Sequence, residues 1–188
     1  MKIALIRHGR TKGNLEKRYI GKTDEALCPE GIESLLKSVS EGKYPEADCV
    51  FSSPLRRCLQ TAEIICPEKE CVIVPEFSEI DFGDFEGKNF QELKDNPSYR
   101  EWIKSNGTMD FPGGESREHF ARRTVEGYKK VLQVLDSEKS SKTVTIICHG
   151  GTIMALLEYL GYGSYFDFQV KNGDGYIFEP GGALCSII

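Results

Sequence analysis

Two short apolar runs, each followed by a histidine and a glycine, constrain the fold of this chain most. The first run, Ile3 to Ile6, leads into Arg7-His8-Gly9, and the second, Val144 to Cys148, leads into His149-Gly150-Gly151. Such β-branched runs predict buried strands, and the glycine after each histidine lets the backbone turn freely. In open α/β sheets, ligands bind at the carboxyl ends of the strands. The repetition therefore predicts two histidines at one ligand-binding edge.

Length and composition favour a small enzyme-sized domain. The 188 residues, 39% of them hydrophobic, predict a single domain over residues 1–188 with a real core and no membrane span. The net charge of -5 argues against general nucleic-acid binding, although a local arginine cluster can still bind a small anion. The first residues show no apolar stretch with a cleavage site, so we expect no signal peptide.

The seven cysteines are an odd number without a CxxC pair, which predicts a reduced, cytoplasmic protein. Cys148 lies beside His149, but successive strand residues point to opposite faces. We therefore expect Cys148 to pack in the core rather than to react.

Apolar runs alternate with helical patterns along the chain. The expected strands are Ile3 to Ile6, Cys49 to Phe51, Val72 to Val74 and Val144 to Cys148. Helices are expected at Pro29 to Ser40 and Pro54 to Cys66 between them. This alternation is typical of βαβ units. It predicts an α/β fold, a three-layer αβα sandwich with a largely parallel central sheet and helices on both faces.

Each helical pattern predicts a buried face. The expected core positions of the first helix are Ile32, Leu35, Leu36 and Val39, and those of the second are Leu55, Leu59, Ala62 and Ile65. A long helix is expected from Glu115 to Leu135, buried through Phe120, Thr124, Tyr128, Val131 and Leu135. A further helix is expected from Thr152 to Leu160.

Two other segments complete the expected fold. The tail, Tyr176 to Phe178 and Ala183 to Ile188, predicts a C-terminal hairpin at the edge of the sheet. The stretch from Glu79 to Gly114 is rich in Phe, Trp, Gly, Asp and Asn and has only short helical pieces. It predicts a lid-like insertion over the carboxyl edge of the sheet.

Polar groups follow each of the four expected parallel strands. They are Arg7 and His8, then Arg57 in the next helix, Glu79 and His149. Two arginines offer planar, permanently charged forks that match phosphate oxygens. The expected ligand is therefore a phosphoryl group.

A phosphoryl pocket needs a nucleophile, and the sequence has no Walker loop, no Cys-x5-Arg element and no suitably placed DxD cluster. Histidine is what remains. A neutral imidazole can attack phosphorus and form a phosphohistidine. Neighbouring arginines and a second histidine lower the pKa of that ring, so the attacking nitrogen stays free.

An ordered set of motifs extends over nearly the whole chain. These motifs are Leu5 to Asn14, Arg18 to Asp24 with Leu27 and Gly31, Ser52 to Ala62, Glu79 to Gly87, Pro112 to Ser116, and His149 to Gly151. The chain resembles the histidine phosphatase superfamily in its phosphoglycerate mutase-like branch. The short segment after Glu79 is most similar to that of the small phosphatases, such as α-ribazole phosphatases and broad-specificity phosphomonoesterases.

The resemblance implies a role for each matching residue. His8 would be phosphorylated, and Arg7, Arg57 and a charged His149 would surround the phosphoryl oxygens. Further substrate contacts would come from Thr11, Asn14, Gly21 and the backbone of Gly150. Glu79 would protonate the leaving alcohol and then take a proton from water, which gives a mildly acidic to neutral pH optimum. The implied activity is a metal-independent phosphomonoesterase acting on a small phosphorylated metabolite, without cofactor, nucleic acid or membrane partner.

Several alternatives stay open. α-Ribazole 5'-phosphate is one candidate substrate, since Phe82, Phe85, Trp102 and Phe111 could stack on a ring, although packing is the more common use of such residues. Mutase-type phosphoryl transfer is the second reading, but Asp84 and Glu86 would repel a bisphosphate. A zinc site of His8, His149 and Glu79 is opposed by the two arginines, and a non-catalytic phospho-ligand binder would not need both nucleophile and acid.

Three smaller questions also stay open. Arg10 either adds positive charge to the site or points outward. Lys12, Lys17, Lys22 and Lys88 could bind an anionic tail or could simply be solvated. His119 is expected on a helix surface, and the oligomeric state cannot be deduced.

Overall fold

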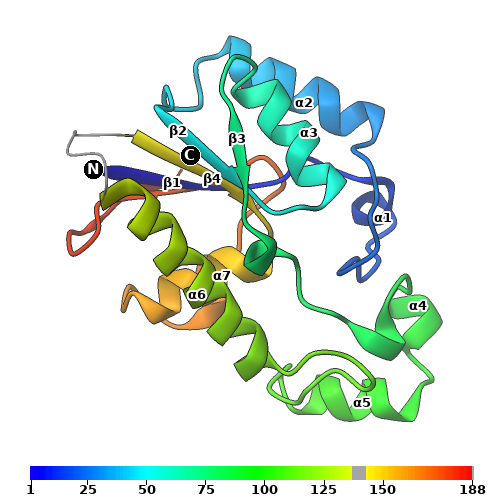
Figure 1. The fold of residues 1–188 in the computed structure, drawn as a ribbon. Helices are drawn as coiled ribbons and strands as arrows, with labels where there is room; N and C mark the ends of the chain where they lie inside the picture. The colour runs from blue at the N-terminus through cyan, green and yellow to red at the C-terminus, as the bar shows by residue number, and fades with distance from the viewer. Residues whose placement is uncertain (137–142, 188) are drawn as a thin grey trace.

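A six-stranded mixed sheet forms the centre of the computed structural model, which describes residues 1–136 and 143–187 (Figure 1). The strands lie in the order β3-β2-β4-β1-β5-β6. Their bounds are β1 (Lys2–Arg7), β2 (Cys49–Ser52), β3 (Cys71–Ile73), β4 (Thr143–Cys148), β5 (Gly175–Phe178) and β6 (Leu184–Ile187). The first four are parallel, and β5 and β6 are antiparallel. The predicted parallel sheet and terminal hairpin are confirmed, and Ile188 lies outside the described residues.

The two histidine-bearing strands are neighbours at the centre of this sheet. Their register runs from Lys2 opposite Thr143 to Arg7 opposite Cys148. The pairing continues one residue further, because the amide of His8 donates to the carbonyl of Cys148 at 3.0 Å. His8 and His149 therefore leave the sheet at the same level.

Helices cover both faces of the sheet, so the three-layer architecture is confirmed (Figure 1). On one face lie α2 (Pro29–Ser40) and α3 (Arg56–Ile65), and on the other lie α6 (Arg117–Asp136) and α7 (Gly150–Tyr159). Strand residues alternate between the layers. Ala4 and Ile6 pack with Ala62 of α3, whereas Ile3 and Leu5 pack with the α6 and α7 layer.

The buried face of α6 is confirmed, but the faces expected for α2 and α3 are wrong in part. In α2 only Leu35 is buried among the four expected positions, while Leu36 is 53% exposed. This helix packs against α3 at the periphery rather than flat on the sheet, so a narrow stripe suffices. In α3 the buried residues are Arg57, Cys58, Thr61 and Ala62. That face is largely polar because it serves the site described below, which a count of apolar letters cannot show.

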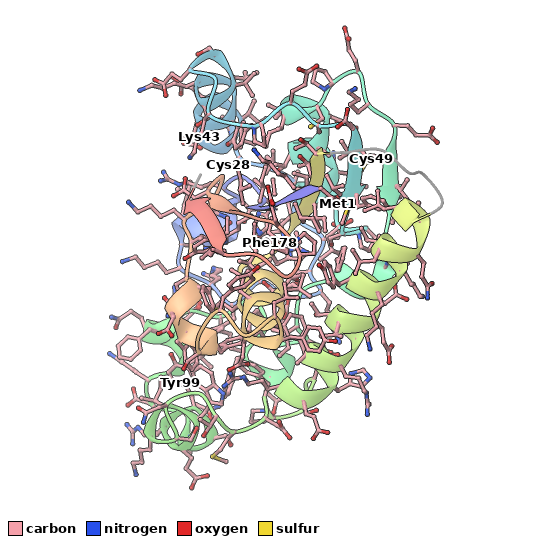
Figure 2. The ribbon with its side chains drawn as sticks, turned by 90° about the vertical axis from the view of Figure 1, so that its left-hand side faces the viewer. Met1, Cys28, Lys43, Cys49, Tyr99 and Phe178 are labelled. Carbon is pink, nitrogen blue, oxygen red and sulfur yellow. The ribbon has the colours of Figure 1, made fainter. Side chains whose placement is uncertain are left out.

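The insertion extends beyond the carboxyl ends of the parallel strands (Figure 1). It contains η2 (Gly83–Phe85), α4 (Phe90–Leu93) and α5 (Pro97–Lys104), and it follows η1 (Pro75–Phe77). It is joined to the segment after α1 (Lys12–Leu15) by hydrogen bonds of Tyr19 with the backbone of Gly87 and Lys88 at 2.8 and 2.9 Å. Figure 2 shows Tyr99 of the insertion at one end of the molecule and Lys43, beyond α2, at the other. The predicted insertion with short helical pieces is thus present.

One more short helix, η3 (Tyr165–Phe168), follows α7 and leads into β5. Within residues 1–136 and 143–187, no helix combines the length and the apolar character needed to cross a membrane.

Candidate active site

The residues expected to share the carboxyl edge of the sheet do meet there. The ring centroids of His8 and His149 are 5.2 Å apart, with the rings at 64° to each other. The charges of Arg7 and Arg57 act on both rings and also on the carboxyl group of Glu79. His8, Arg57 and His149 are almost completely buried, at 4%, 0% and 0% exposure. Four separate elements therefore deliver one compact, cationic site.

The hydrogen bond of His8 defines which of its nitrogens is free. Nδ1 lies 2.7 Å from the carbonyl oxygen of Gly9. A carbonyl only accepts, so Nδ1 carries the proton and Nε2 keeps its lone pair. Burial lowers the pKa of His8 well below 6.5, and Arg57 and Arg7 lower that pKa further. His8 is therefore a neutral imidazole with Nε2 available as a nucleophile.

His149 has different partners. Its Nε2 lies 2.8 Å from the hydroxyl oxygen of Ser53 and 3.5 Å from the thiol of Cys58. Burial, followed by Arg57, His8 and Arg7, lowers the pKa of His149 well below 6.5. This differs from the charged His149 that we expect from the sequence, because the surrounding cations oppose a second positive charge. A phosphate dianion between the rings would favour the charged form again.

The two arginines are held at one end and unsatisfied at the other. Arg57 donates from Nη1 to the carbonyl of Thr23 and from Nη2 to that of Gly21, each at 2.8 Å. Arg7 donates from Nη1 to the carbonyl of Val170 at 2.7 Å. The Nε atoms of both arginines are buried without a hydrogen-bond partner among the residues that the structure describes. A buried unsatisfied donor is costly, so two of them beside His8 indicate a binding site for anionic oxygens.

Glu79 is a buried carboxyl group at the start of the insertion. Burial raises its pKa, although amide hydrogen bonds from Ile80 and Gly151 and the charges of Arg57 and Arg7 oppose that rise. The Ile80 amide donates to Oε1 at 3.0 Å. A carboxyl group with a raised pKa can hold a proton at a pH where ordinary carboxylates have lost it. This is the property that a general acid needs.

The side chain of Arg123, which the sequence did not single out, holds the backbone of Glu79 in place, and we call this contact the Arg123 clamp. Arg123 of α6 donates to the carbonyl oxygens of Glu79 at 3.0 Å and Ser78 at 2.6 Å. Its other donors bind both carboxylate oxygens of Glu115 at 2.7 Å. Arg123 is not among the expected buried positions of this helix, which are Phe120, Thr124, Tyr128, Val131 and Leu135. The available signal was an arginine three residues after Phe120, on the same side of the helix.

Two glycines, Gly151 and Gly21, are required by close approaches, whereas Gly150 has room for a side-chain carbon. A Cβ at Gly151 would lie 2.5 Å from Oε1 of Glu79, and one at Gly21 would lie 2.1 Å from the carbonyl oxygen of Ile80. The amide of Gly21 donates to Glu86 at 2.9 Å. Gly150 begins α7, and a Cβ there would lie 3.6 Å from the guanidinium carbon of Arg7. Substrate contacts by Gly21 and Gly150 stay predictions.

Thr11 and Asn14 form a capping box at the start of α1. The Thr11 hydroxyl accepts from the Asn14 amide, and the Asn14 side chain accepts from the Thr11 amide, both at 3.2 Å. Asn172, which sequence reasoning missed, donates to Oδ1 of Asn14 at 3.0 Å and to the carbonyl of His8 at 3.1 Å. Both capping residues are thus tied to the loop that carries His8, and their contact with substrate stays a prediction.

An aromatic pocket of about 300 Å³ opens beside Glu79 and Arg7. Six rings line it, those of Tyr19, Phe82, Trp102, Phe111, Tyr165 and Phe166. Phe85 is fully buried and packs beneath them. The packing expected of such residues is confirmed for Phe85, and Phe82, Trp102 and Phe111 form part of the pocket wall, while stacking on a substrate ring stays a prediction.

The other residues singled out in the sequence lie as follows. Cys148 is fully buried in the core against α6 and α7, as expected, and burial raises its pKa well above 9.0. His119 lies on the helix surface, with its Nδ1 2.6 Å from Oε1 of Glu115. Arg10 is exposed. Within the described residues, no three His, Cys, Asp or Glu side chains are grouped closely enough to hold a metal ion.

Comparison with known proteins gives a consistent result. A family model described as the histidine phosphatase superfamily (branch 1) matches residues 3–186. An uncharacterized phosphatase of Bacillus subtilis is 33% identical over 86% of this chain and 78% of its own length. An adenosylcobalamin/alpha-ribazole phosphatase of Salmonella typhimurium is 27% identical, over 92% and 87% of the two chains. The structure of a phosphoglycerate mutase from Thermus thermophilus superimposes with a TM-score of 0.74 at 29% identity, covering 100% of this chain and 98% of that one.

Proposed function

Because this chain belongs to branch 1 of the histidine phosphatase superfamily and is a phosphatase, we propose that it hydrolyses a small phosphomonoester through a phosphohistidine. Nε2 of His8 attacks phosphorus while the bond from phosphorus to the alcohol oxygen breaks. The alcohol leaves with a proton from Glu79. Water then attacks the phosphohistidine, Glu79 takes a proton from that water, and inorganic phosphate leaves.

One observation carries this proposal: a neutral imidazole with a free Nε2 shares the site with two arginines whose buried Nε–H groups have no partner among the described residues. The arginines supply donors for the phosphoryl oxygens, and burial together with their charge lowers the pKa of His8. Fixed donors of this kind stabilise the charge of a transition state without reorganisation. We assign Arg7, Arg57 and His149 to that role.

The aromatic pocket supports a flat or apolar alcohol as the leaving group. Glu79 is one of its lining residues, so an alcohol oxygen protonated by Glu79 has its carbon skeleton in this pocket. The volume of about 300 Å³ suits a small metabolite. A relative is described as an adenosylcobalamin/alpha-ribazole phosphatase, and α-ribazole 5'-phosphate, which carries a ring, is our first candidate.

The mutase alternative rests on relatives described as phosphoglycerate mutases. That alternative depends on whether the acidic residues of the insertion are free to repel a bisphosphate. Asp81 pairs with Lys22, and Glu86 accepts hydrogen bonds from the amides of Gly21 and Thr23 at 2.9 and 3.0 Å. These contacts favour a structural use of both acids. Transfer of phosphate from the phosphoenzyme to phosphoglycerate, rather than to water, would support the mutase.

We also propose that residues 1–188 act as one catalytic domain, with residues 79–114 as a lid over the site. The insertion supplies Glu79 and three of the six rings of the aromatic pocket, which supports this role. A cytoplasmic location is part of the same proposal. The free thiols of Cys28, Cys58, Cys66, Cys71 and Cys148 fit a reducing compartment.

The decisive experiment compares wild type with His8→Ala on a panel of phosphomonoesters that includes α-ribazole 5'-phosphate, in buffer containing a metal chelator. We expect wild type to release phosphate and to form an acid-labile, base-stable phosphoenzyme, and the variant to do neither. His119→Ala is the matched control, since it removes an exposed histidine from the same chain. A wild type that cleaves no member of the panel, or a His8→Ala variant equal to it, would overturn the proposal.

A further inference from the structure

A second hollow adjoins the aromatic pocket at Arg7. Its volume is about 430 Å³, and we call it the basic hollow. Its cationic lining is Arg7, Arg10, Lys17, Arg18 and Lys171, and Asn14 contributes a polar amide. Arg7 and Val170 line both hollows. The basic hollow therefore shares Arg7, one of the residues of the catalytic site, with the aromatic pocket.

The charge of this hollow is concentrated and mostly uncompensated. None of its lining residues is acidic, although the whole chain has a net charge of -5. Arg18 is neutralised by Glu16 and Glu92, each at 2.6 Å. By contrast, Arg10, Lys17 and Lys171 form no ion pair with any described residue. Such a cluster attracts a small oxyanion strongly.

Hydrogen bonds between its lining residues hold the floor of the hollow in place. Asn172 ties the side chain of Asn14 to the carbonyl of His8, and Val170 anchors the guanidinium of Arg7. Lys17 has a φ of 54°, in the left-handed region that side chains other than glycine rarely adopt. That conformation costs free energy.

Glu79 distinguishes the two hollows chemically. It lines the aromatic pocket and is absent from the lining of the basic hollow. A leaving alcohol that takes its proton from Glu79 is therefore on the aromatic side. The species left on the cationic side of Arg7 is the phosphoryl group.

We propose that the basic hollow is a second oxyanion site, which receives the inorganic phosphate product as it leaves the catalytic pocket past Arg7. This inference rests on the proposed phosphatase function for its ligand. The site binds phosphate noncovalently, and its occupation does not require the catalytic pocket to be empty. Phosphate bound there faces Arg7 and slows the next turnover.

The first test counts phosphate sites by isothermal titration calorimetry. We expect two sites per wild-type chain and one in the Arg10→Ala/Lys171→Ala double variant. Any residual binding in the hollow should be about tenfold weaker or more, because charge-assisted contacts are lost. Lys12→Ala is the matched control, since Lys12 is an exposed neighbour on α1 outside the lining. Equal stoichiometry and affinity in wild type and double variant would overturn the second site.

The second test uses product inhibition. In wild type, phosphate should raise the apparent KM and also lower the apparent kcat. In the double variant it should only raise KM, while kcat and KM without added phosphate stay unchanged. Chloride at matched ionic strength should leave the calorimetric sites intact, and an effect of chloride equal to that of phosphate would overturn an oxyanion site. Because the calorimetry needs no turnover, failure of the phosphatase proposal would not be mistaken for failure of this one.

Discussion

The ends of β1 and β4 look alike in sequence, but the structure treats their histidines differently. Both follow a central parallel strand, both are buried, and burial with nearby arginines lowers both pKa values. His8 binds a backbone carbonyl through Nδ1, which leaves Nε2 free. His149 has its Nε2 against the Ser53 hydroxyl. The hydrogen bond made by one ring nitrogen therefore separates an expected nucleophile from an expected stabiliser of phosphoryl oxygens.

The largest expected effect comes from breaking this comparison directly. His8→Ala should lower kcat by about 10⁴-fold or more and abolish the phosphoenzyme, because it removes the nucleophile. His149→Ala should lower kcat by about 10²- to 10³-fold and still form some phosphoenzyme, because it removes only transition-state stabilisation. Rapid-quench measurement of the phosphoenzyme checks both. Equal losses of phosphoenzyme in the two variants would show that the histidines are not divided in this way.

Glu79→Gln tests the acid that serves His8. We expect about 10²- to 10⁴-fold slower release of an alkyl alcohol, since a general acid contributes about that much. The loss should be much smaller with 4-nitrophenyl phosphate, because that leaving group needs no proton. Rapid-quench rates of phosphoenzyme formation on the two substrates provide the measurement, since this step precedes the attack of water. Equal losses in the rate of formation on both would assign Glu79 to binding instead.

The pH profile sharpens the assignment of the two groups. Below the lowered pKa of His8 the nucleophile becomes protonated, so the rate falls on the acidic side. Above the raised pKa of Glu79 the acid loses its proton, so the rate falls on the alkaline side. We expect a mildly acidic to neutral optimum for wild type and loss of the alkaline limb in Glu79→Gln. An undiminished Glu79→Gln rate with an alkaline-shifted optimum would contradict this role.

Smaller effects on the rate are expected when the hydroxyl groups that hydrogen-bond to His149 and to the residue after His8 are removed. Ser53→Ala removes the partner of His149, whereas Thr61→Val removes the hydroxyl that accepts from the Gly9 amide at 3.0 Å. One hydrogen bond corresponds to about a threefold to tenfold change in rate. Phosphoenzyme formation should slow in Thr61→Val, and phosphoenzyme breakdown and formation should slow together in Ser53→Ala. The same rapid-quench traces separate the two, and identical traces would refute the distinction.

The pH dependence of the free energy of unfolding tests the lowered pKa that the two histidines share. Their folded pKa values lie below the unfolded value of about 6.5, so below pH 6.5 the unfolded chain binds more protons and folding weakens. Each histidine contributes up to about 1.4 kcal/mol per pH unit, and Glu79, with its raised pKa, acts in the opposite sense above its unfolded value. His8→Ala and His149→Ala should each reduce the acid slope in urea titrations. An unchanged slope in both buried variants would mean that neither pKa is lowered.

The sheet was predictable because each strand carries its own signal. Apolar runs of four to six residues specify β1, β2 and β4 locally, and the glycines after β1 and β4 mark where those two strands end. The helix faces were less predictable. Leu36 follows Leu35 directly but faces solvent, because α2 packs against α3 and the loop of Gly9 and Arg10 along a narrow stripe that excludes Leu36. Whether a residue of α2 is buried depends on α3, which lies 20 residues or more away in sequence, and no local pattern encodes that contact.

The sequence by itself determined the chemistry: which histidines, arginines and glutamate stand at strand ends, since parallel strands bring their carboxyl ends to one edge. The tertiary structure alone decided how those groups are tuned. The anchoring of Arg7 and Arg57 and the Arg123 clamp on Glu79 depend on contacts between residues 36 to 163 positions apart. The tautomer of His8 depends on the carbonyl of its neighbour Gly9, which the folded loop places against Nδ1. Burial then shifts their pKa values, because desolvation is a property of the packed fold and not of the residue.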